Sequence, residues 1–241
     1  MLPQILSALL LIGCTTPENS DCDGDGARST CLSPTQSEAY YIEQSSMYFD
    51  TMDYTVDLEV PPAYSELVAR WEWSPWLKLT AFGLENITAT DTLLQLYPSI
   101  VPERECLAFD EQPFGRCYVV FYYDDHGGKS CPIYEEFTFN DGGEITFIEA
   151  WSDQADLLPM GDLSDRWAEG EVDRLSERVP GLGRADGLID LDGEAMISAA
   201  EEDEVLADFL YRANDWQETW LEEYAASNGD EMWSTGCGWA E

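Results

Sequence analysis

Residues 135–151, EEFTFNDGGEITFIEAW, contain the pattern that decides the fold of this chain. Two runs rich in aromatic and β-branched residues flank Asp141-Gly142-Gly143. Such runs favour β-strands, and Asp-Gly favours a tight turn between them. We therefore predict a hairpin of strands 131–140 and 144–153, in which Asp141-Gly142 is the turn and Asn140 faces Gly143.

The predicted pairing divides the side chains of the hairpin between two faces, because successive residues of a strand point to opposite sides. One face carries Tyr134, Glu136, Thr138, Ile145, Phe147, Glu149 and Trp151. The other carries Ile133, Glu135, Phe137, Phe139, Thr146, Ile148 and Ala150. Both faces are largely apolar, so we expect both to be covered by other parts of the chain.

The remaining elements are predicted from apolar spacing outward from the hairpin. Apolar residues at helical intervals predict helices over 39–57, with Ser37 as N-cap, over 65–73 and over 85–97. Residues 117–125, CYVVFYYDD, predict a further strand. Residues 156–193 have no clear period and are expected to form loop, and 194–241 one or two helices packing back on the domain. The predicted class is α+β, with helices packed on a curved antiparallel sheet and an added C-terminal helical segment.

This order of elements, three helices followed by strands that end in a long hairpin, resembles the nuclear transport factor 2-like superfamily. The hairpin itself, with its Asp-Gly turn and the strand EITFIEAW, is similar to that of SnoaL-like proteins. The resemblance covers residues 39–155 and implies a curved sheet wrapped around helices, enclosing a conical pocket. Members include isomerases, cyclases and dehydratases, and many others that only bind ligands or partners, often as dimers. No catalytic motif of the family matches this chain residue by residue.

The candidate catalytic residues therefore come from the hairpin alone. In the predicted pairing Tyr134 faces Glu149, and Glu136 lies diagonally from it. A carboxylate on an apolar cavity wall has a raised pKa and can act as a general base, while Tyr134 can donate to a developing oxyanion. Glu135, on the opposite face, is the rival candidate. The alternative is that these glutamates lie at the rim or pair with Arg104 or Arg116.

Charge composition excludes several partners. The 241 residues include 49 Asp plus Glu and 11 Lys plus Arg, a net charge of −38. Such a surface repels nucleic acid and anionic lipid head groups. It fits cation binding, tolerance of high salt, or simply a well-solvated surface.

The N-terminal residues predict export and a lipid anchor. The apolar run from Ile5 to Ile12 is too short for a membrane-spanning helix, which needs roughly 20 residues, and has the length of a signal-peptide core. Leu11-Ile12-Gly13-Cys14 resembles the lipobox of bacterial lipoproteins. The resemblance implies a signal peptide over 1–13, lipidation of Cys14 and attachment in the cell envelope. Thr15, which is not Asp, implies the outer membrane.

Residues 14–38 are rich in Ser, Thr, Pro, Asp and Gly and are predicted to form an acidic flexible tether. Within it, Asp21, Asp23 and Asp25 are spaced as in the first half of a calcium loop, and Gly26 follows. The second half is missing, because Leu32 occupies the position of the bidentate Glu. A calcium site and a plain acidic tether are both compatible with this pattern.

Cysteine usage agrees with export. With Cys14 lipidated, six cysteines remain, an even number that suggests disulfides in an oxidising compartment. Six cysteines allow 15 pairings, and the sequence does not select among them. One arrangement pairs Cys22 with Cys31 in a local loop and Cys106 with Cys117 across a hairpin, and the remaining pair, Cys131–Cys237, would then join the C-terminal segment to the domain. No CxxC pair occurs, so a zinc ribbon or a thioredoxin-type redox site is not predicted.

Together these features favour a lipid-anchored envelope protein whose pocket-forming domain binds a small apolar ligand or a protein partner. One alternative is a small isomerase- or cyclase-type enzyme with a carboxylate general base. Another is a calcium-binding envelope protein. No cofactor other than Ca²⁺ is suggested, and a homodimer through the sheet stays open.

Overall fold

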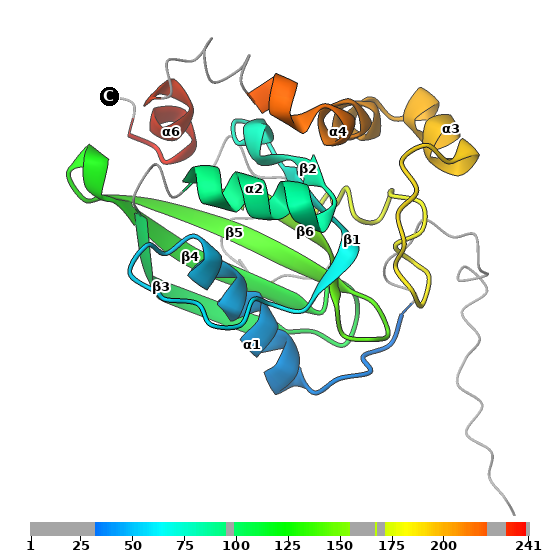
Figure 1. Ribbon diagram of the computed structural model, residues 1–241, viewed down its shortest axis with the longest axis horizontal. Helices are drawn as coiled ribbons and strands as arrows, with labels where there is room; N and C mark the ends of the chain where they lie inside the picture. The colour runs from blue at the N-terminus through cyan, green and yellow to red at the C-terminus, as the bar shows by residue number, and fades with distance from the viewer. Residues whose placement is uncertain (1–31, 95–98, 155–166, 168–171, 221–229, 240–241) are drawn as a thin grey trace, which may run out of the picture.

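The predicted hairpin lies at the centre of a six-stranded sheet in the computed structural model, which describes residues 32–94, 99–154, 167, 172–220 and 230–239. The strand order is β2-β1-β6-β5-β4-β3 (Figure 1). All neighbouring strands are antiparallel except β1 and β6, which are parallel. The strands are β1 (Tyr64–Glu72), β2 (Ala81–Phe82), β3 (Ser99–Ala108), β4 (Gly115–Tyr123), β5 (Lys129–Phe139) and β6 (Ile145–Ser152).

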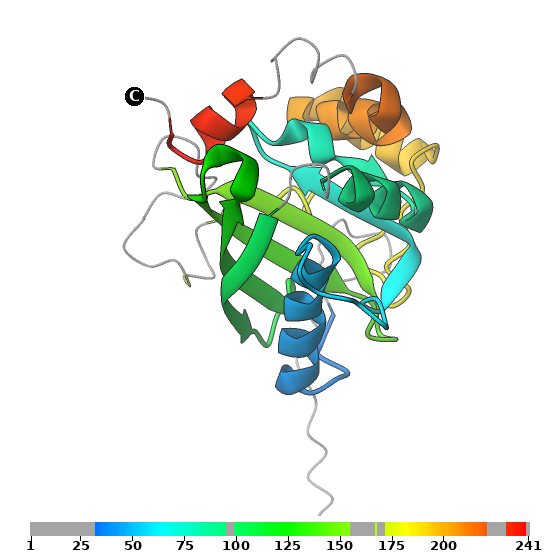
Figure 2. The ribbon, with the colours of Figure 1, turned by 60° about the vertical axis from the view of Figure 1, so that its left-hand side comes forward.

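Helices cover the sheet in two groups. The first helices, α1 (Glu38–Tyr48) and α2 (Leu84–Leu94), lie on one face of the sheet, which we call the inner face (Figures 1 and 2). The C-terminal helices are α3 (Glu194–Glu202), α4 (Glu204–Asn214) and α6 (Asp230–Gly236). The short 3₁₀ helices are η2 (Phe49–Thr51), η3 (Leu77–Leu79) and η4 (Asp124–His126). The α+β class with an added C-terminal helical segment is confirmed.

The hairpin register differs from the predicted one by two residues. The loop is longer than a two-residue turn, because the amide of Asn140 donates to the carbonyl of Glu144 at 3.0 Å. Glu136 consequently faces Glu149, and Tyr134 faces Trp151 rather than Glu149. A shift of two residues by itself keeps a side chain on its predicted face, since the side-chain period of a strand is two, and this holds for Tyr134, Glu136 and Glu149.

Two positions of the hairpin do change face. The pairing is irregular between Thr138 and Phe139, which is where a β-bulge interrupts the alternation. Ile145 therefore joins Phe139 in the inner core. Thr146 lies instead against the loop at Gly187 on the other side of the sheet, which we call the outer face.

Residues 65–72 belong to strand β1, so the prediction of a helix over 65–73 is wrong. Arg70 and Val68 point to the inner face, while Ala69 and Trp71 pack in the outer core. The first part of the strand, Ser65 to Ala69, lacks the alternation of apolar and polar residues that marks a half-exposed strand. The edge strand β3 was not predicted either, since its charged run Glu103 to Glu105 hides the pattern.

The helix prediction over 39–57 is right only in its first part. Ser37 caps α1 as predicted, accepting from the amide of Tyr40 at 3.3 Å. The α-helix ends at Tyr48 and continues as the 3₁₀ turn η2. Beyond that turn, Asp53 accepts hydrogen bonds from the amide of Thr55 and the amide of Val101, which ties this segment to β3.

Both faces of the sheet are covered, as the apolar hairpin predicts. The inner core joins α1 and α2 to the sheet through side chains such as Tyr48, Phe49 and Phe137. The outer core is covered by the irregular segment 172–191 and by α3 and α4, with Leu175, Leu182, Met196, Leu206 and Phe209 fully or almost fully buried. The described residues 172–191, which we expected to form loop, therefore contribute to the core.

Two of the three disulfides of the arrangement given above are present in the described residues. Cys106 and Cys117 face each other on β3 and β4, and Cys131 on β5 joins Cys237 directly after α6. Cys22 and Cys31, the third pair, lie outside the described residues. Among the helices that the structure describes, none combines the length and the apolar character needed to cross a bilayer.

Candidate functional site

Glu136, a predicted catalytic residue, lies on the outer face in a buried ion-pair cluster. It accepts from Arg116 Nε at 2.7 Å through Oε1 and from Arg174 Nε at 2.7 Å through Oε2. Arg116 comes from the neighbouring strand β4, and Arg174 comes from the segment over the outer face. Only 2% of Glu136 is exposed, so the carboxylate is enclosed by its two partners. This matches the alternative in which the hairpin glutamates pair with arginine.

Glu149, the predicted general base, also lies under the outer segment. Its carboxylate accepts from the indole of Trp73 at 2.8 Å and from the amides of Leu175 and Ser176 at 2.7 and 3.1 Å. Burial and the nearby Glu136 raise the pKa of Glu149 to about 7, while the three N–H donors oppose that increase. The residue therefore fastens segment 172–191 to the sheet.

Tyr134 stacks on Trp151 and packs against Tyr118, again on the outer face. The three predicted catalytic residues thus share one face as expected, but that face is turned away from the inner cavity. On that face Glu136 pairs with arginine, Glu149 accepts from backbone amides, and Tyr134 stacks on Trp151. The predicted lipidation residue Cys14 and the predicted calcium ligands Asp21, Asp23 and Asp25 lie outside the described residues. In the part of the chain that is described, no group of three or more potential ligating side chains could hold a metal ion.

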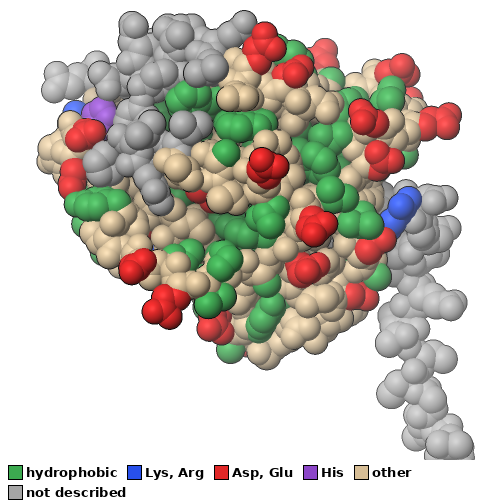
Figure 3. Space-filling view, in the orientation of Figure 1, with side chains coloured by type: hydrophobic (Ala, Val, Ile, Leu, Met, Phe, Trp, Pro, Cys, Tyr) green, Lys and Arg blue, Asp and Glu red, His purple; other side chains and the backbone are tan. Residues whose placement is uncertain are grey.

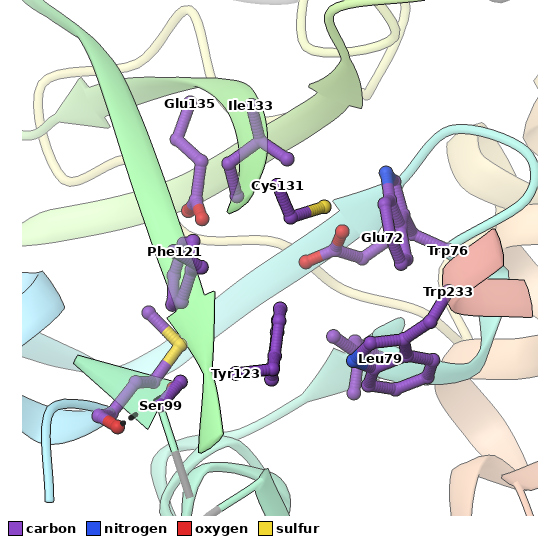
Figure 4. Close-up of a pocket in the computed structure, with 11 residues that line it drawn as sticks. Glu72, Trp76, Leu79, Ser99, Phe121, Tyr123, Cys131, Ile133, Glu135 and Trp233 are labelled. Carbon is purple, nitrogen blue, oxygen red and sulfur yellow. Dashed lines mark hydrogen bonds between the residues drawn. The ribbon is translucent and has the colours of Figure 1, made fainter. Parts of the chain in front are cut away.

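The inner face contains a cavity near one end of the sheet (Figure 4). Its wall is mostly apolar and comes from β1, β3, β4, β5, η3 and α6. The lining residues are Met52, Glu72, Trp76, Leu79, Ser99, Phe121, Tyr123, Cys131, Ile133, Glu135 and Trp233. The volume accessible to water is about 30 Å³, which is room for roughly two water molecules.

Two carboxyl groups project into this cavity. Glu72 extends from β1 and Glu135 from β5, and Figure 4 shows both carboxyl groups directed into the same space. Both residues are nearly inaccessible, with 4% and 2% exposed. Glu135 is the rival candidate of the sequence analysis, and the structure gives it the cavity position that Glu149 was expected to have.

A buried polar cluster lies directly behind the two glutamates. Arg70 donates to Asp91 at 2.7 Å and to the hydroxyl of Tyr48 at 2.9 Å, and its Nε lies 3.7 Å from Glu72. The guanidinium also bonds the hydroxyl of Thr90 and the carbonyl of Leu79. Because Arg70 is fully buried and held by this many partners, it is a fixed positive charge beside Glu72.

Burial makes the two glutamates weak acids. Desolvation raises the pKa of Glu72 to about 8, with Asp91 raising it further and Arg70 opposing the change. Desolvation, followed by the charge of Glu72, raises the pKa of Glu135 well above its ordinary value. Two carboxyl groups that share an apolar space favour protonation of at least one of them near neutral pH.

The C-terminal helix α6 closes one side of the cavity. Trp233 packs edge-to-face on Trp76 and on Tyr123, with ring centroids 5.7 and 6.0 Å apart. The Cys131–Cys237 disulfide and a hydrogen bond from the hydroxyl of Ser152 to the carbonyl of Gly236 fasten the helix end to the sheet. A ligand larger than the cavity would have to displace Trp233 to enter from this side.

The raised pKa of Glu72 predicts that stability falls with rising pH. A carboxyl group with a higher pKa in the folded state binds protons more tightly there, so its contribution is complete below the unfolded pKa and is lost as pH rises through about 8. The Glu72→Gln variant should show a smaller loss of unfolding free energy between about pH 5 and pH 9 than the wild type, by more than about 1 kcal/mol. Urea denaturation across this range measures the difference.

The control is Glu66→Gln, since Glu66 lies on the same strand and is exposed. Its pH dependence should equal that of the wild type. Identical curves for wild type and Glu72→Gln would contradict the raised pKa.

No protein-family model and no curated protein matches the chain. Among solved structures, the chain is similar to the crystal structure of a protein of unknown function with a cystatin-like fold from Methylobium petroleophilum. The TM-score is 0.40 with 15% sequence identity, over 58% of this chain and 86% of that one. This likeness does not bear on the function.

Sequence reasoning missed Glu72, Asp91 and Arg70 as members of the site. The predicted helix over 65–73 would place Arg70 and Glu72 on different faces. In the strand that the structure shows, residues two apart lie on the same face. The available signal was Arg70 and Glu72 alternating with Trp71 and Trp73, since a period of two favours a strand over a helix.

Proposed function

We propose that this protein binds a small ligand in the cavity of its inner face, while a lipid on Cys14 holds it at a bacterial membrane. The observation that supports binding is the enclosed apolar cavity with the carboxyl groups of Glu72 and Glu135 on its wall. Small-molecule sites are commonly concave and apolar, with few polar groups that orient the ligand. A domain folded only for stability gains nothing from two carboxyl groups in such a place, because burying them costs free energy.

The rigid surroundings of the cavity favour binding without large rearrangement. Arg70, beside the lining residue Glu72, is held by a buried hydrogen bond to Asp91, and the Cys131–Cys237 disulfide holds the end of α6. A preformed site loses little conformational entropy when a ligand enters. The volume of about 30 Å³ limits the ligand, or the part of it that enters, to a few non-hydrogen atoms.

Filling the cavity should abolish binding. In the Ile133→Phe variant the larger ring enters the space that Ile133 lines, so a ligand found by screening small alcohols, ketones and amines should lose its affinity. Nuclear magnetic resonance titration of the wild type and the variant measures this loss.

The matched control is Ile197→Phe, the same substitution at a position on α3 that is 47% exposed. Its affinity should equal that of the wild type. A ligand that binds Ile133→Phe as tightly as the wild type would place the binding site elsewhere.

The anchoring part of the proposal is supported by the apolar run that ends in Leu11-Ile12-Gly13-Cys14. Expressed in a bacterium, the wild type should appear in the membrane fraction with the mass of a lipidated chain. The Cys14→Ala variant should carry no lipid and leave that fraction. Membrane association that survives this substitution would contradict lipid anchoring.

A further inference from the structure

We propose that the cavity ligand is a small alkylammonium cation, held between the carboxyl groups of Glu72 and Glu135 and the aromatic rings that line the cavity. This inference rests on the proposed function and names the chemical class of the ligand. It follows from one unpartnered carboxylate oxygen, from the charge balance of the polar cluster, and from the aromatic wall.

The first observation is the state of the Glu135 carboxyl group. One side of it interacts with the hydroxyl of Tyr48, whereas Oε2 has no hydrogen-bond partner among the described residues. A buried polar atom without a partner costs free energy, on the order of 1–3 kcal/mol. Since the carboxyl group of Glu135 is directed into the cavity (Figure 4), an N–H donor placed there could satisfy its unpartnered oxygen.

The second observation is the charge balance behind the cavity. Arg70 donates to Asp91 at 2.7 Å, and its distance to Glu72 is 3.7 Å, so the positive charge is mainly matched by Asp91. The other titratable groups that interact with the two glutamates are the hydroxyls of Tyr48, Tyr64 and Tyr123, which are neutral at ordinary pH. Ionised Glu72 and Glu135 would therefore lack a full counter-charge, and a cation in the cavity would supply it.

The third observation is the aromatic wall. The rings of Phe121, Tyr123, Trp76 and Trp233 line the cavity beside the carboxyl groups (Figure 4). Aromatic faces attract cations, and a desolvated site strengthens that attraction. Aromatic rings combined with carboxylates favour an organic ammonium group over a metal ion, because a metal ion requires more oxygen ligands than two glutamates provide.

The protein surface favours cations as well. Acidic side chains are spread over the face of the molecule in Figure 3, and the net charge of −38 raises the local concentration of cations. In the empty cavity the raised pKa of Glu72, about 8, means that a proton occupies the pair near neutral pH. An arriving ammonium group displaces that proton, so binding and proton release are coupled.

Isothermal titration calorimetry with methylammonium and methanol tests the inference, because the two probes are similar in size and differ in charge. We expect methylammonium to bind at least about tenfold more tightly than methanol, since hydrogen bonds to charged groups are stronger. Its affinity should rise from about pH 6 to about pH 9 as the glutamates lose their proton, while the amine, with a pKa near 10, stays charged. Buffers of different ionisation enthalpy should report about one proton released per cation bound.

Two variants locate the site. Glu135→Gln and Glu72→Gln should each weaken methylammonium binding by about tenfold or more and reduce the proton release. Glu66→Gln, exposed on the same strand as Glu72, should bind like the wild type. The probe comparison uses the wild-type protein alone, so it decides the question even if a variant fails to fold.

The outcomes separate this inference from the proposed function. Equal affinity for methanol and methylammonium would overturn the cation and leave a cavity that binds small molecules. Potassium ions competing as strongly as methylammonium would also overturn it, because the site would then be a general monovalent-cation site. If neither methanol, methylammonium nor any other small molecule binds, both the proposed function and the inference fail.

Discussion

Replacing Glu136 with glutamine is expected to lower the free energy of unfolding by about 3 to 5 kcal/mol. Glu136 lies between Arg116 and Arg174, with an Nε–oxygen distance of 2.7 Å to each. Arg116 is fully buried, so removing the carboxylate leaves its charge in a medium that solvates it poorly. Urea denaturation followed by tryptophan fluorescence measures the loss.

The matched control for this prediction is Glu177→Gln. Glu177 also pairs with Arg174, at 3.2 Å, but its side chain is 38% exposed, so its loss should cost less than about 1 kcal/mol. A change of similar size in both variants would show that burial does not govern the Glu136 cluster. A catalytic carboxylate commonly shows the opposite behaviour, since its removal can stabilise a protein while activity is lost.

Removing the Cys131–Cys237 disulfide is expected to lower stability by about 4 to 5 kcal/mol and to release α6 from the cavity. The two cysteines are 106 residues apart, so the bond removes a large amount of chain entropy from the unfolded state. It also fastens the end of the helix that carries Trp233. In Cys131→Ser/Cys237→Ser, amide hydrogen exchange in residues 230–239 should therefore accelerate more than in β5 and β6.

The control is Cys106→Ser/Cys117→Ser, which removes a disulfide that spans only 11 residues of sequence. Loop-closure entropy predicts a smaller loss here, about 3 kcal/mol, and hydrogen exchange in α6 should stay as in the wild type. Equal losses in the two double variants, or unchanged exchange in α6 after loss of Cys131–Cys237, would contradict the role given to this bond. The comparison also tests whether α6 controls access to the cavity, because ligand exchange should be faster only when it is released.

Local sequence patterns were sufficient to predict the hairpin, its two covered faces and a Cys106–Cys117 pair. These features depend on local chemistry: alternating apolar residues set the faces, and Asp141-Gly142-Gly143 sets the position of the loop. Helix α1 was likewise predicted from apolar spacing and its N-cap Ser37, and helix α2 from apolar spacing. The Cys106–Cys117 pair followed from a turn-rich stretch between two cysteines.

Only the tertiary structure decided which face of the hairpin lines the cavity. Both faces are apolar and both carry glutamates, so periodicity alone cannot tell Glu135 from Glu149. The distinction arises because the inner face has a cavity beside Glu135, whereas on the outer face the amides of Leu175 and Ser176 donate to Glu149. Contacts between segments so far apart in sequence leave no local pattern to detect.

The same reason explains the error at residues 65–73. Residues 65–69 show no alternation, and four alternating residues from Arg70 to Trp73 are too few to exclude a helix in isolation. Strand β1 pairs in parallel with β6, and no short turn connects the two strands in the sequence. This pairing places Arg70 and Glu72 on the inner face. Local sequence thus determines which segments are apolar and where they turn. Long-range packing determines which carboxyl groups line a cavity and which pair with arginine.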